Sequence, residues 1–254
     1  MQDYTQRFTS RADNYARYRP SYAPAVLDLL RRECGLTPDW VIADVGSGTG
    51  ISTAMFLDHG NRVYGVEPND AMRAYAEQTL SGNLRFTSIA ARAEATTLPG
   101  ASVDLVAAGQ AFHWFEPDAT RFEWARILRP GGWVALMWNS RQDGDSPFAR
   151  GYEALLKQYS LDYQQVHHRN VGDEEFDAFF GAGAWRRASF DNPQTRDWER
   201  LSGGLQSGSY TPEPGHPNHA PLMEGMRRLF EEHQVDGYVV LPTATEVYYG
   251  RLSS

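Results

Sequence analysis

The chain has 254 residues, of which 41% are hydrophobic and 22% are charged, and its formal net charge is −8. No apolar run approaches the roughly 20 residues that span a bilayer, the first residues lack the regions of a signal peptide, and no basic stripe typical of nucleic-acid-binding proteins is present. We therefore expect a cytoplasmic protein, monomer or homodimer, that acts on a small molecule and has neither nucleic acid nor membrane as a partner.

Two helices are expected before the first strand. Residues 1–20 are polar and aromatic, and a terminal helix there would pack on the domain. Residues 22–34 show an amphipathic pattern in which Val26, Leu30 and Cys34 share one face, and Gly35 ends it.

Residues 41–50, which read VIADVGSGTG, are the stretch around which we expect the fold to be organised. A short β-branched run meets alternating glycines, and an apolar helical pattern over residues 51–58 follows at once. This order is typical of a strand, a tight turn and a helix start, as found where nucleotides dock on parallel sheets. Glycine adopts backbone conformations closed to residues with a Cβ atom, and it lets a ligand lie against the main chain.

Strand and helix patterns alternate after this turn. We expect strands at residues 62–66, 84–89, 103–107 and 133–138. Between them we expect one helix from Asn69 or Asp70 to about Gly82, and another from Pro117 that is broken at residues 130–132, with Phe122, Ile127 and Leu128 facing inward. Alternation at this spacing indicates βαβ units and a parallel sheet.

The regular alternation of strand and helix patterns ends after Asn139. Further helices are expected at residues 148–159, 174–180, 197–205 and 222–233, and strands at residues 185–190, 238–241 and 245–252, the last two closing the sheet. Residues 207–221 are rich in Pro, Gly, Ser and His, which favours a long surface loop or lid. We interpret residues 1–254 as a single domain with a cap formed by about residues 1–20, 140–184 and 206–221.

Three kinds of ligand are considered for the glycine turn. A phosphate-binding loop needs Lys followed by Ser or Thr after its glycines, and here Ile51 and Ser52 follow Gly50. A dinucleotide fingerprint needs a glycine where Ile51 falls, so an NAD-dependent oxidoreductase is a weak alternative. Binding of S-adenosylmethionine requires only that the backbone of the turn lies close to the ligand.

The motifs resemble those of class I S-adenosylmethionine-dependent methyltransferases. Residues 44–50 are similar to the first motif of that family, and residues 65–69 (GVEPN) are similar to the second. Residues 93–99 resemble the third motif, residues 109–115 resemble the segment after the fourth strand, and residues 128–132 resemble the turn before the fifth strand. Together these segments cover about residues 8–139 in the family's order.

The part of the chain after Asn139 resembles the family less closely. Residues 208–210 (GSY) and 249–252 (YGRL) are similar to the small-molecule branch that includes aconitate methyltransferase-like proteins. The resemblance implies an α/β, Rossmann-like and mostly parallel seven-stranded sheet, with helices on both faces and a small helical cap. It also implies an enzyme that moves the methyl group of S-adenosyl-L-methionine to an O, N or C nucleophile of a small-molecule acceptor. The alternative is a cofactor-binding accessory or regulatory protein with this fold and no turnover.

The resemblance further assigns cofactor contacts. It implies that Glu67, near the surface of the empty site, accepts hydrogen bonds from both ribose hydroxyls, and that Asp44 lies near the cofactor's ammonium group. Met72 either covers the adenine face or packs in the core. Many relatives have Asp where Arg92 stands, and an arginine cannot accept the adenine amine. The implied cofactor-binding residues are Asp44, Gly46, Ser47, Gly48, Thr49, Gly50, Glu67, Pro68, Met72, Ala93, Glu94, Gln110 and Arg19.

Other residues are candidates for the acceptor side of the site. His113 is the candidate catalytic residue, because an imidazole there could take a proton from the acceptor, although packing is an equal interpretation. No metal constellation is apparent, since His167 and His168 are adjacent in sequence. The candidates for the substrate pocket are Tyr15, Trp114, Trp138, Asn139 and Tyr210.

Overall fold

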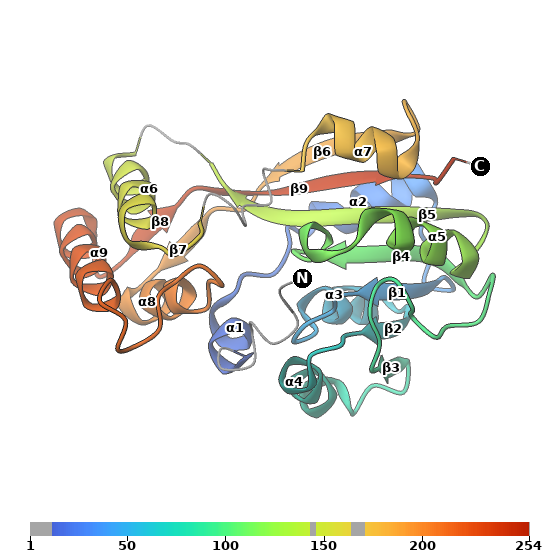
Figure 1. The fold of residues 1–254 in the computed structure, drawn as a ribbon, viewed down its shortest axis with the longest axis horizontal. Helices are drawn as coiled ribbons and strands as arrows, with labels where there is room; N and C mark the ends of the chain where they lie inside the picture. The colour runs from blue at the N-terminus through green and yellow to red at the C-terminus, as the bar shows by residue number, and fades with distance from the viewer. Residues whose placement is uncertain (1–11, 143–145, 164–170, 254) are drawn as a thin grey trace.

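The computed structural model describes residues 12–142, 146–163 and 171–253, so Phe8, His167 and His168 lie outside the described residues. Its centre is a seven-stranded sheet in the order β3-β2-β1-β4-β5-β9-β6 (Figure 1). The strands are β1 Val41–Val45, β2 Arg62–Val66, β3 Phe86–Ile89, β4 Val103–Gly109, β5 Leu128–Arg141, β6 Trp185–Asp191 and β9 Thr243–Gly250.

The first five strands of the sheet pair in parallel, and β9 is antiparallel to both of its neighbours. The predicted α/β fold with a mostly parallel seven-stranded sheet is therefore confirmed. Parallel strands need helical crossovers, and the glycine turn falls at the first of them, between β1 and α3 (Ile51–His59).

Helices cover both faces because alternate strand residues point to opposite sides. On one face Ile42 and Leu105 pack with α3 and with α2 (Ala25–Leu29), which continues as the π-helical segment η3 (Leu30–Cys34). On the other face Ala43 and Val106 pack under aromatic side chains of α5 and α7. The remaining helices of the sheet region are α4 Asp70–Leu80, α5 Pro117–Ile127 and α7 Asp173–Phe180, with the short η4 Phe112–Trp114 after β4.

A second group of elements forms a cap at one end of the sheet (Figure 1). The long strands β5 and β9 run into this end, and a separate hydrophobic cluster centred on Leu156, Leu201 and Met226 holds the cap together. The cap consists of α6 Pro147–Tyr159, α8 Trp198–Gln206, α9 His219–His233 and a two-stranded ribbon of β7 Gln194–Arg196 and β8 Val239–Leu241.

The first described helix, α1 (Ala12–Tyr18), joins the cap to the sheet region. It packs against α8 and also touches α4 (Figure 1). The contact with α8 is close, because a Cβ atom on Gly203 would lie 2.3 Å from the ring of Tyr18. Helix α1 therefore lies over the boundary between the two parts of the molecule.

Several sequence expectations need correction. Phe122 is 76% exposed, because Trp124 and Ile127 define the inner face of α5 and Phe122 falls on the opposite side of the helical turn. Leu128 begins β5, which runs through the predicted break at residues 130–132. Residues 238–241 do not close the sheet, because β8 pairs with β7 in the cap ribbon.

The cap also differs from its expected outline. Helix α7 lies inside the range 140–184, yet Phe176, Phe179 and Phe180 pack against the sheet. Helices α8 and α9, which lie outside the expected ranges or at their edge, supply much of the cap's hydrophobic cluster. Among the described residues no helix is long and apolar enough to cross a membrane.

Candidate cofactor and acceptor site

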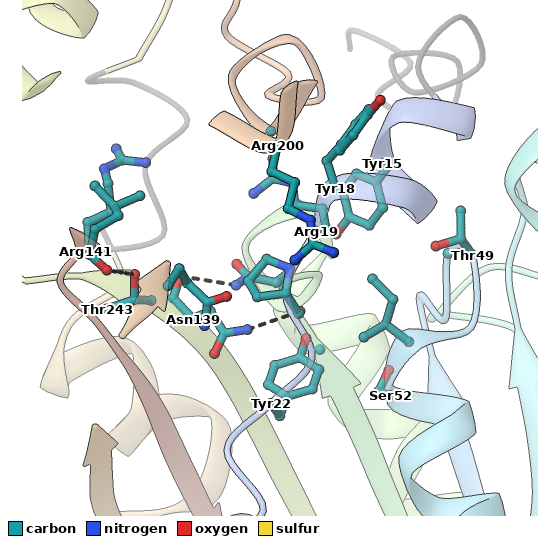
Figure 2. Close-up of a pocket in the computed structure, with 18 of the residues that line it drawn as sticks. Tyr15, Tyr18, Arg19, Tyr22, Thr49, Ser52, Asn139, Arg141, Arg200 and Thr243 are labelled. Carbon is teal, nitrogen blue, oxygen red and sulfur yellow. Dashed lines mark hydrogen bonds between the residues drawn. The ribbon is translucent and has the colours of Figure 1, made fainter. Parts of the chain in front are cut away.

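A cleft opens where α1, the glycine turn and the cap meet (Figure 2). Its sheet side is formed by residues 46–49 of the turn, by Gln110, which follows β4, and by Asn139, which lies near the end of β5. Ligands bind at the carboxyl ends of strands in open parallel sheets, which is where these residues lie. Its cap side includes Arg141 and Tyr210, so the cleft extends from the glycine turn into the cap.

The glycines of the turn are required by the protein's own packing. Gly46 has a φ of +67°, and a Cβ atom there would lie 2.6 Å from the Cβ of Ala111. Gly50 has a φ of +89°, and its Cβ would lie 2.8 Å from a methyl carbon of Leu80 in α4. The first glycine thus lets the loop after β4 approach the turn, and the third lets α3 and α4 pack closely.

This packing predicts a large stability difference between two glycine substitutions. Gly46→Ala should lower the free energy of unfolding by about 2–4 kcal/mol, because it combines a left-handed backbone with an overpacked contact. Gly82→Ala is the matched control, since a Cβ there meets no atom within 4 Å. Urea denaturation of both variants measures the difference. Equal midpoints would contradict this account of the turn.

Asp44 is fully buried at the end of β1. Its Oδ2 atom accepts hydrogen bonds from Ser52 Oγ at 2.8 Å and from Thr53 Oγ1 at 2.6 Å, both in the first turn of α3. Burial raises the pKa of Asp44 to about 6, against the opposing effect of these hydroxyls. Asp44 therefore fixes the start of α3, and Ser52 is the member of this group that lines the cleft.

Glu67 lies directly after β2 and is only 8% exposed. Its carboxylate accepts the backbone N–H of Gly48 at 2.9 Å and that of Asn69 at 2.8 Å. Burial raises its pKa, while these two hydrogen bonds act in the opposite direction. A carboxylate has about four acceptor sites, so it can hold the turn and still accept ligand hydroxyls. The expectation of a carboxylate near the surface is therefore wrong, because it is enclosed by the turn that it holds.

The adenine-side candidates lie outside the lining of the cleft. Met72 is 5% exposed, and its terminal methyl carbon lies 3.2 Å from where a Cβ of Gly48 would be. Ala93 is buried, and Glu94 accepts the backbone N–H of Glu116 at 3.0 Å, just before α5 begins. Pro68 lies between Glu67 and the N-cap residue Asn69. Glu94 thus already serves the start of a helix in this structure.

Arg19 and Tyr15 come from α1 and the residue that follows it. The guanidinium of Arg19 lies 5.0 Å from the centroid of the Tyr15 ring, and both side chains line the cleft opposite Thr49 (Figure 2). The Nε atom of Arg19 and the Oγ1 atom of Thr49 are buried and have no hydrogen-bond partner among the described residues. Burial raises the pKa of Tyr15. These two atoms are a free donor and a free hydroxyl for a ligand.

Gln110 and Asn139 form the floor of the cleft. Gln110 has a φ of +58°, an uncommon conformation for a residue with a side chain and one that concentrates at functional sites. Its side-chain amide donates to the carbonyl of Asn139 at 3.2 Å. Asn139 in turn accepts Thr245 Oγ1 at 2.6 Å and donates to the carbonyl of Ser21 at 3.2 Å. Asn139 therefore ties β5 to β9 and to the segment after α1.

His113, Trp114 and Trp138 do not line the cleft. The indole N–H of Trp138 donates to His113 Nδ1 at 3.3 Å, and the imidazole packs against Trp114 with ring centroids 4.7 Å apart. Trp138 is only 2% exposed. An imidazole that accepts at Nδ1 carries its proton at Nε2, so it is not poised there to take another.

The role of His113 is tested by substitution. We expect His113→Ala to leave turnover within about threefold and to lower thermal stability, because the ring fills space beside Trp138. A loss of about 10²–10⁴-fold, with a flattened acidic limb of the pH–rate profile, would instead establish the imidazole as a general base. Initial rates across pH measure this, with His216→Ala in the exposed loop before α9 as the matched control.

On the cap side of the cleft, Tyr210 is a predicted pocket residue that lines the cleft, and the other polar lining residues were not predicted from the sequence. They contribute cationic, amide and hydroxyl groups from elements far apart in the chain, and they carry no shared local motif. Among them, only Arg141 is close in sequence to a predicted site residue, since it lies two residues after Asn139. The missed lining residues are Arg141, Tyr152, Gln194, Arg196, Arg200 and Thr243. Within the described residues, no group of three or more His, Cys, Asp or Glu side chains could hold a metal ion.

Comparison with known proteins agrees with this geometry. Residues 43–136 match the family described as methyltransferase domain. Over this stretch the chain is similar to methyltransferase domains, a class whose cofactor is S-adenosylmethionine. The match begins in β1 and ends in β5, so it contains the glycine turn, Glu67 and the loop after β4.

The chain also has relatives whose own function is not characterised. An uncharacterized methyltransferase of Mycobacterium tuberculosis is 35% identical over 145 residues, which are 56% of this chain and 55% of the relative. One from Schizosaccharomyces pombe is 32% identical over 149 residues, 57% of this chain and 56% of the relative. The chain thus matches only about half the length of these curated relatives.

Solved structures share the fold of this chain. A protein from Anaeromyxobacter dehalogenans described as a type II methyltransferase has a TM-score of 0.68 at 23% identity, over 92% of this chain and 98% of that one. A phosphoethanolamine N-methyltransferase from Haemonchus contortus has a TM-score of 0.57 at 16% identity, over 99% of this chain and 59% of that one. At these identities the likeness shows the fold alone.

S-adenosylmethionine is the cofactor that this class of domain implies, and the site fits it. Glu67 is buried directly after β2, behind the cleft lining, and accepts the backbone N–H of Gly48 in the turn, while Arg19 lines the cleft with an Nε atom that has no hydrogen-bond partner among the described residues. The glycine turn lies between them and exposes backbone to the cleft. We assign no acidic side chain to the adenine. Arg92 is exposed, and Glu94 already accepts a hydrogen bond at the start of α5.

Proposed function

We propose that the protein transfers the methyl group of S-adenosylmethionine to an O, N or C nucleophile of a small-molecule acceptor. The observation that carries the proposal is a single continuous cleft that leads from the glycine turn of the methyltransferase domain into a polar cap. A cofactor held at the turn and an acceptor held by the cap would then meet within one enclosure. No cap of this kind is needed merely to retain a cofactor.

When bound, the cofactor supplies a methyl group that its sulfonium charge has already activated. The chain's residues therefore have three tasks, which are to bind, to orient and to exclude water. Glu67 would hold the ribose hydroxyls, and Arg19 would pair with the carboxylate of the methionine portion. Tyr15 and Tyr210 would wall the space between turn and cap. A hydroxyl or amine acceptor must also lose a proton, whereas an anionic acceptor need not.

Transfer of label tests this proposal. The protein is incubated with S-adenosylmethionine labelled in the methyl group and with a fractionated metabolite extract, and acid-soluble products are separated from the cofactor. We expect label in a small-molecule fraction, and a strongly reduced rate with Glu67→Gln. Tight cofactor binding without any transfer would instead favour an accessory or regulatory protein.

A further inference from the structure

The charge of the cleft is opposite to that of the whole chain. The chain has a formal net charge of −8, yet the cleft is lined by Arg19, Arg141, Arg196 and Arg200 and by no Asp or Glu side chain among the described residues. The carboxylate of the cofactor can pair with one of these arginines. Arg19 is the one that lies nearest the glycine turn (Figure 2). The three others belong to β5, β7 and α8, and they face the cap side.

Arg196 is the most informative of the three because it is only 9% exposed. Its Nη1 atom donates to the carbonyl of Tyr18 at 2.6 Å and more weakly to that of Arg200 at 3.5 Å. Both partners are neutral, and burial lowers its pKa. A buried guanidinium is costly unless a negative charge accompanies it. Within the described part of the chain, no carboxylate lies within 4 Å of this group.

Arg141 is held rigidly on the same side of the cleft. It donates to the hydroxyls of Tyr210 and Tyr163, and its guanidinium lies 5.2 Å from the centroid of the Tyr152 ring. Glu153 lies 3.8 Å away, but its carboxylate also accepts the Tyr163 hydroxyl at 2.8 Å and is 3.6 Å from the ammonium of Lys157. Within the described residues, Glu153 is the one carboxylate that lies within 4 Å of any of the three guanidinium groups on this side of the cleft.

We propose that the methyl acceptor is a small organic oxyanion, held in the cap by Arg196 and Arg141, with the exposed Arg200 at the rim. This inference rests on the proposed methyl transfer and names its substrate class. Guanidinium groups bind carboxylates and phosphates through paired N–H donors, so both chemistries fit the arginines. The anion also supplies the counter-charge that Arg196 lacks. The fixed Arg141 then selects the acceptor's orientation.

Calorimetry of the protein saturated with S-adenosylhomocysteine tests the inference. The titrants are succinate for the carboxylate arm, inorganic phosphate for the phosphate arm, and succinamide as the uncharged match. We expect succinate or phosphate to bind and succinamide not to bind. Arg196→Met should weaken anion binding by about tenfold or more, with S-adenosylhomocysteine affinity within twofold of the parent. Arg186→Met is the control, because that arginine is 72% exposed on β6 and lies outside the cleft.

The outcomes separate the two proposals. If S-adenosylhomocysteine binds but neither anion does, or if succinamide binds as well as succinate, the oxyanion inference is overturned and the methyl-transfer proposal stands. If S-adenosylhomocysteine itself fails to bind, both are overturned. Should Arg196→Met not fold, Arg141→Met and Arg200→Met replace it, and unchanged anion affinity in both would refute the assignment.

Discussion

Glu67→Ala should weaken the binding of S-adenosylhomocysteine by about 10- to 150-fold, which corresponds to roughly 1.5–3 kcal/mol for lost hydrogen bonds to a charged group. The substitution should also lower the free energy of unfolding by about 1–3 kcal/mol. This second effect arises because the carboxylate accepts the backbone N–H groups of Gly48 and Asn69, and both would lose their acceptor.

Two measurements separate these effects. Calorimetry well below the unfolding temperature gives the affinity, and thermal denaturation without ligand gives the stability. Glu67→Gln should fall between the parent and Glu67→Ala, since an amide oxygen can still accept one of the two N–H groups. Glu231→Ala is the control, because that carboxylate lies exposed on α9 and pairs only with Arg227. A Glu67→Ala protein with parental affinity would make Glu67 a purely structural residue.

The second large effect is a pH dependence of stability that arises at Asp44. Burial raises the pKa of this carboxyl from 3.8 to about 6 in the folded protein, so the folded state holds its proton more tightly than the unfolded state does. Stability contributed by Asp44 is therefore present at low pH and is lost as the pH rises from about 4 to about 6. The two-unit difference corresponds to about 3 kcal/mol.

Asp44→Asn should remove this contribution. Denaturant unfolding between pH 4 and 7 should show a flatter profile for the variant, and the two proteins should differ most above pH 6. Glu67 also has a raised pKa and adds a slope of the same sign; because the charge of Asp44 contributes to that shift, the slope from Glu67 should also become smaller in the variant. Asp28→Asn, at a side chain that is 72% exposed on α2, is the control. A parental slope in Asp44→Asn would contradict the assignment.

The parallel part of the fold could be predicted because its signals are local. The strands of that part contain β-branched or apolar runs, and the glycine turn marks the first crossover. The buried face of α5 was harder to predict, because Phe122 and Trp124 are both large and apolar. The packing of Trp124 with Phe112 and Phe179 from distant segments decides which of the two is buried.

The candidate site divides in the same way. The turn and Gln110 follow strands whose positions the sequence reveals, and Asn139 lies near the end of another such strand, so the sheet side of the cleft could be anticipated. The cap side depends on β7, which is three residues long and polar, and on its pairing with β8 some 45 residues later. Arginine has no local pattern that marks it as buried, so Arg196 becomes informative only when its surroundings are known. His113 stood beside a recognisable motif, yet it points to Trp138.

We expect the cleft to hold S-adenosylmethionine and not a dinucleotide. The decisive measurement is parallel calorimetric titration of the protein with S-adenosylmethionine, S-adenosylhomocysteine and NAD. We predict saturable one-site binding of the first two and no heat of binding with NAD, because Ile51 occupies the position where a dinucleotide fingerprint needs its last glycine. Binding of NAD without binding of S-adenosylmethionine or S-adenosylhomocysteine would contradict the account.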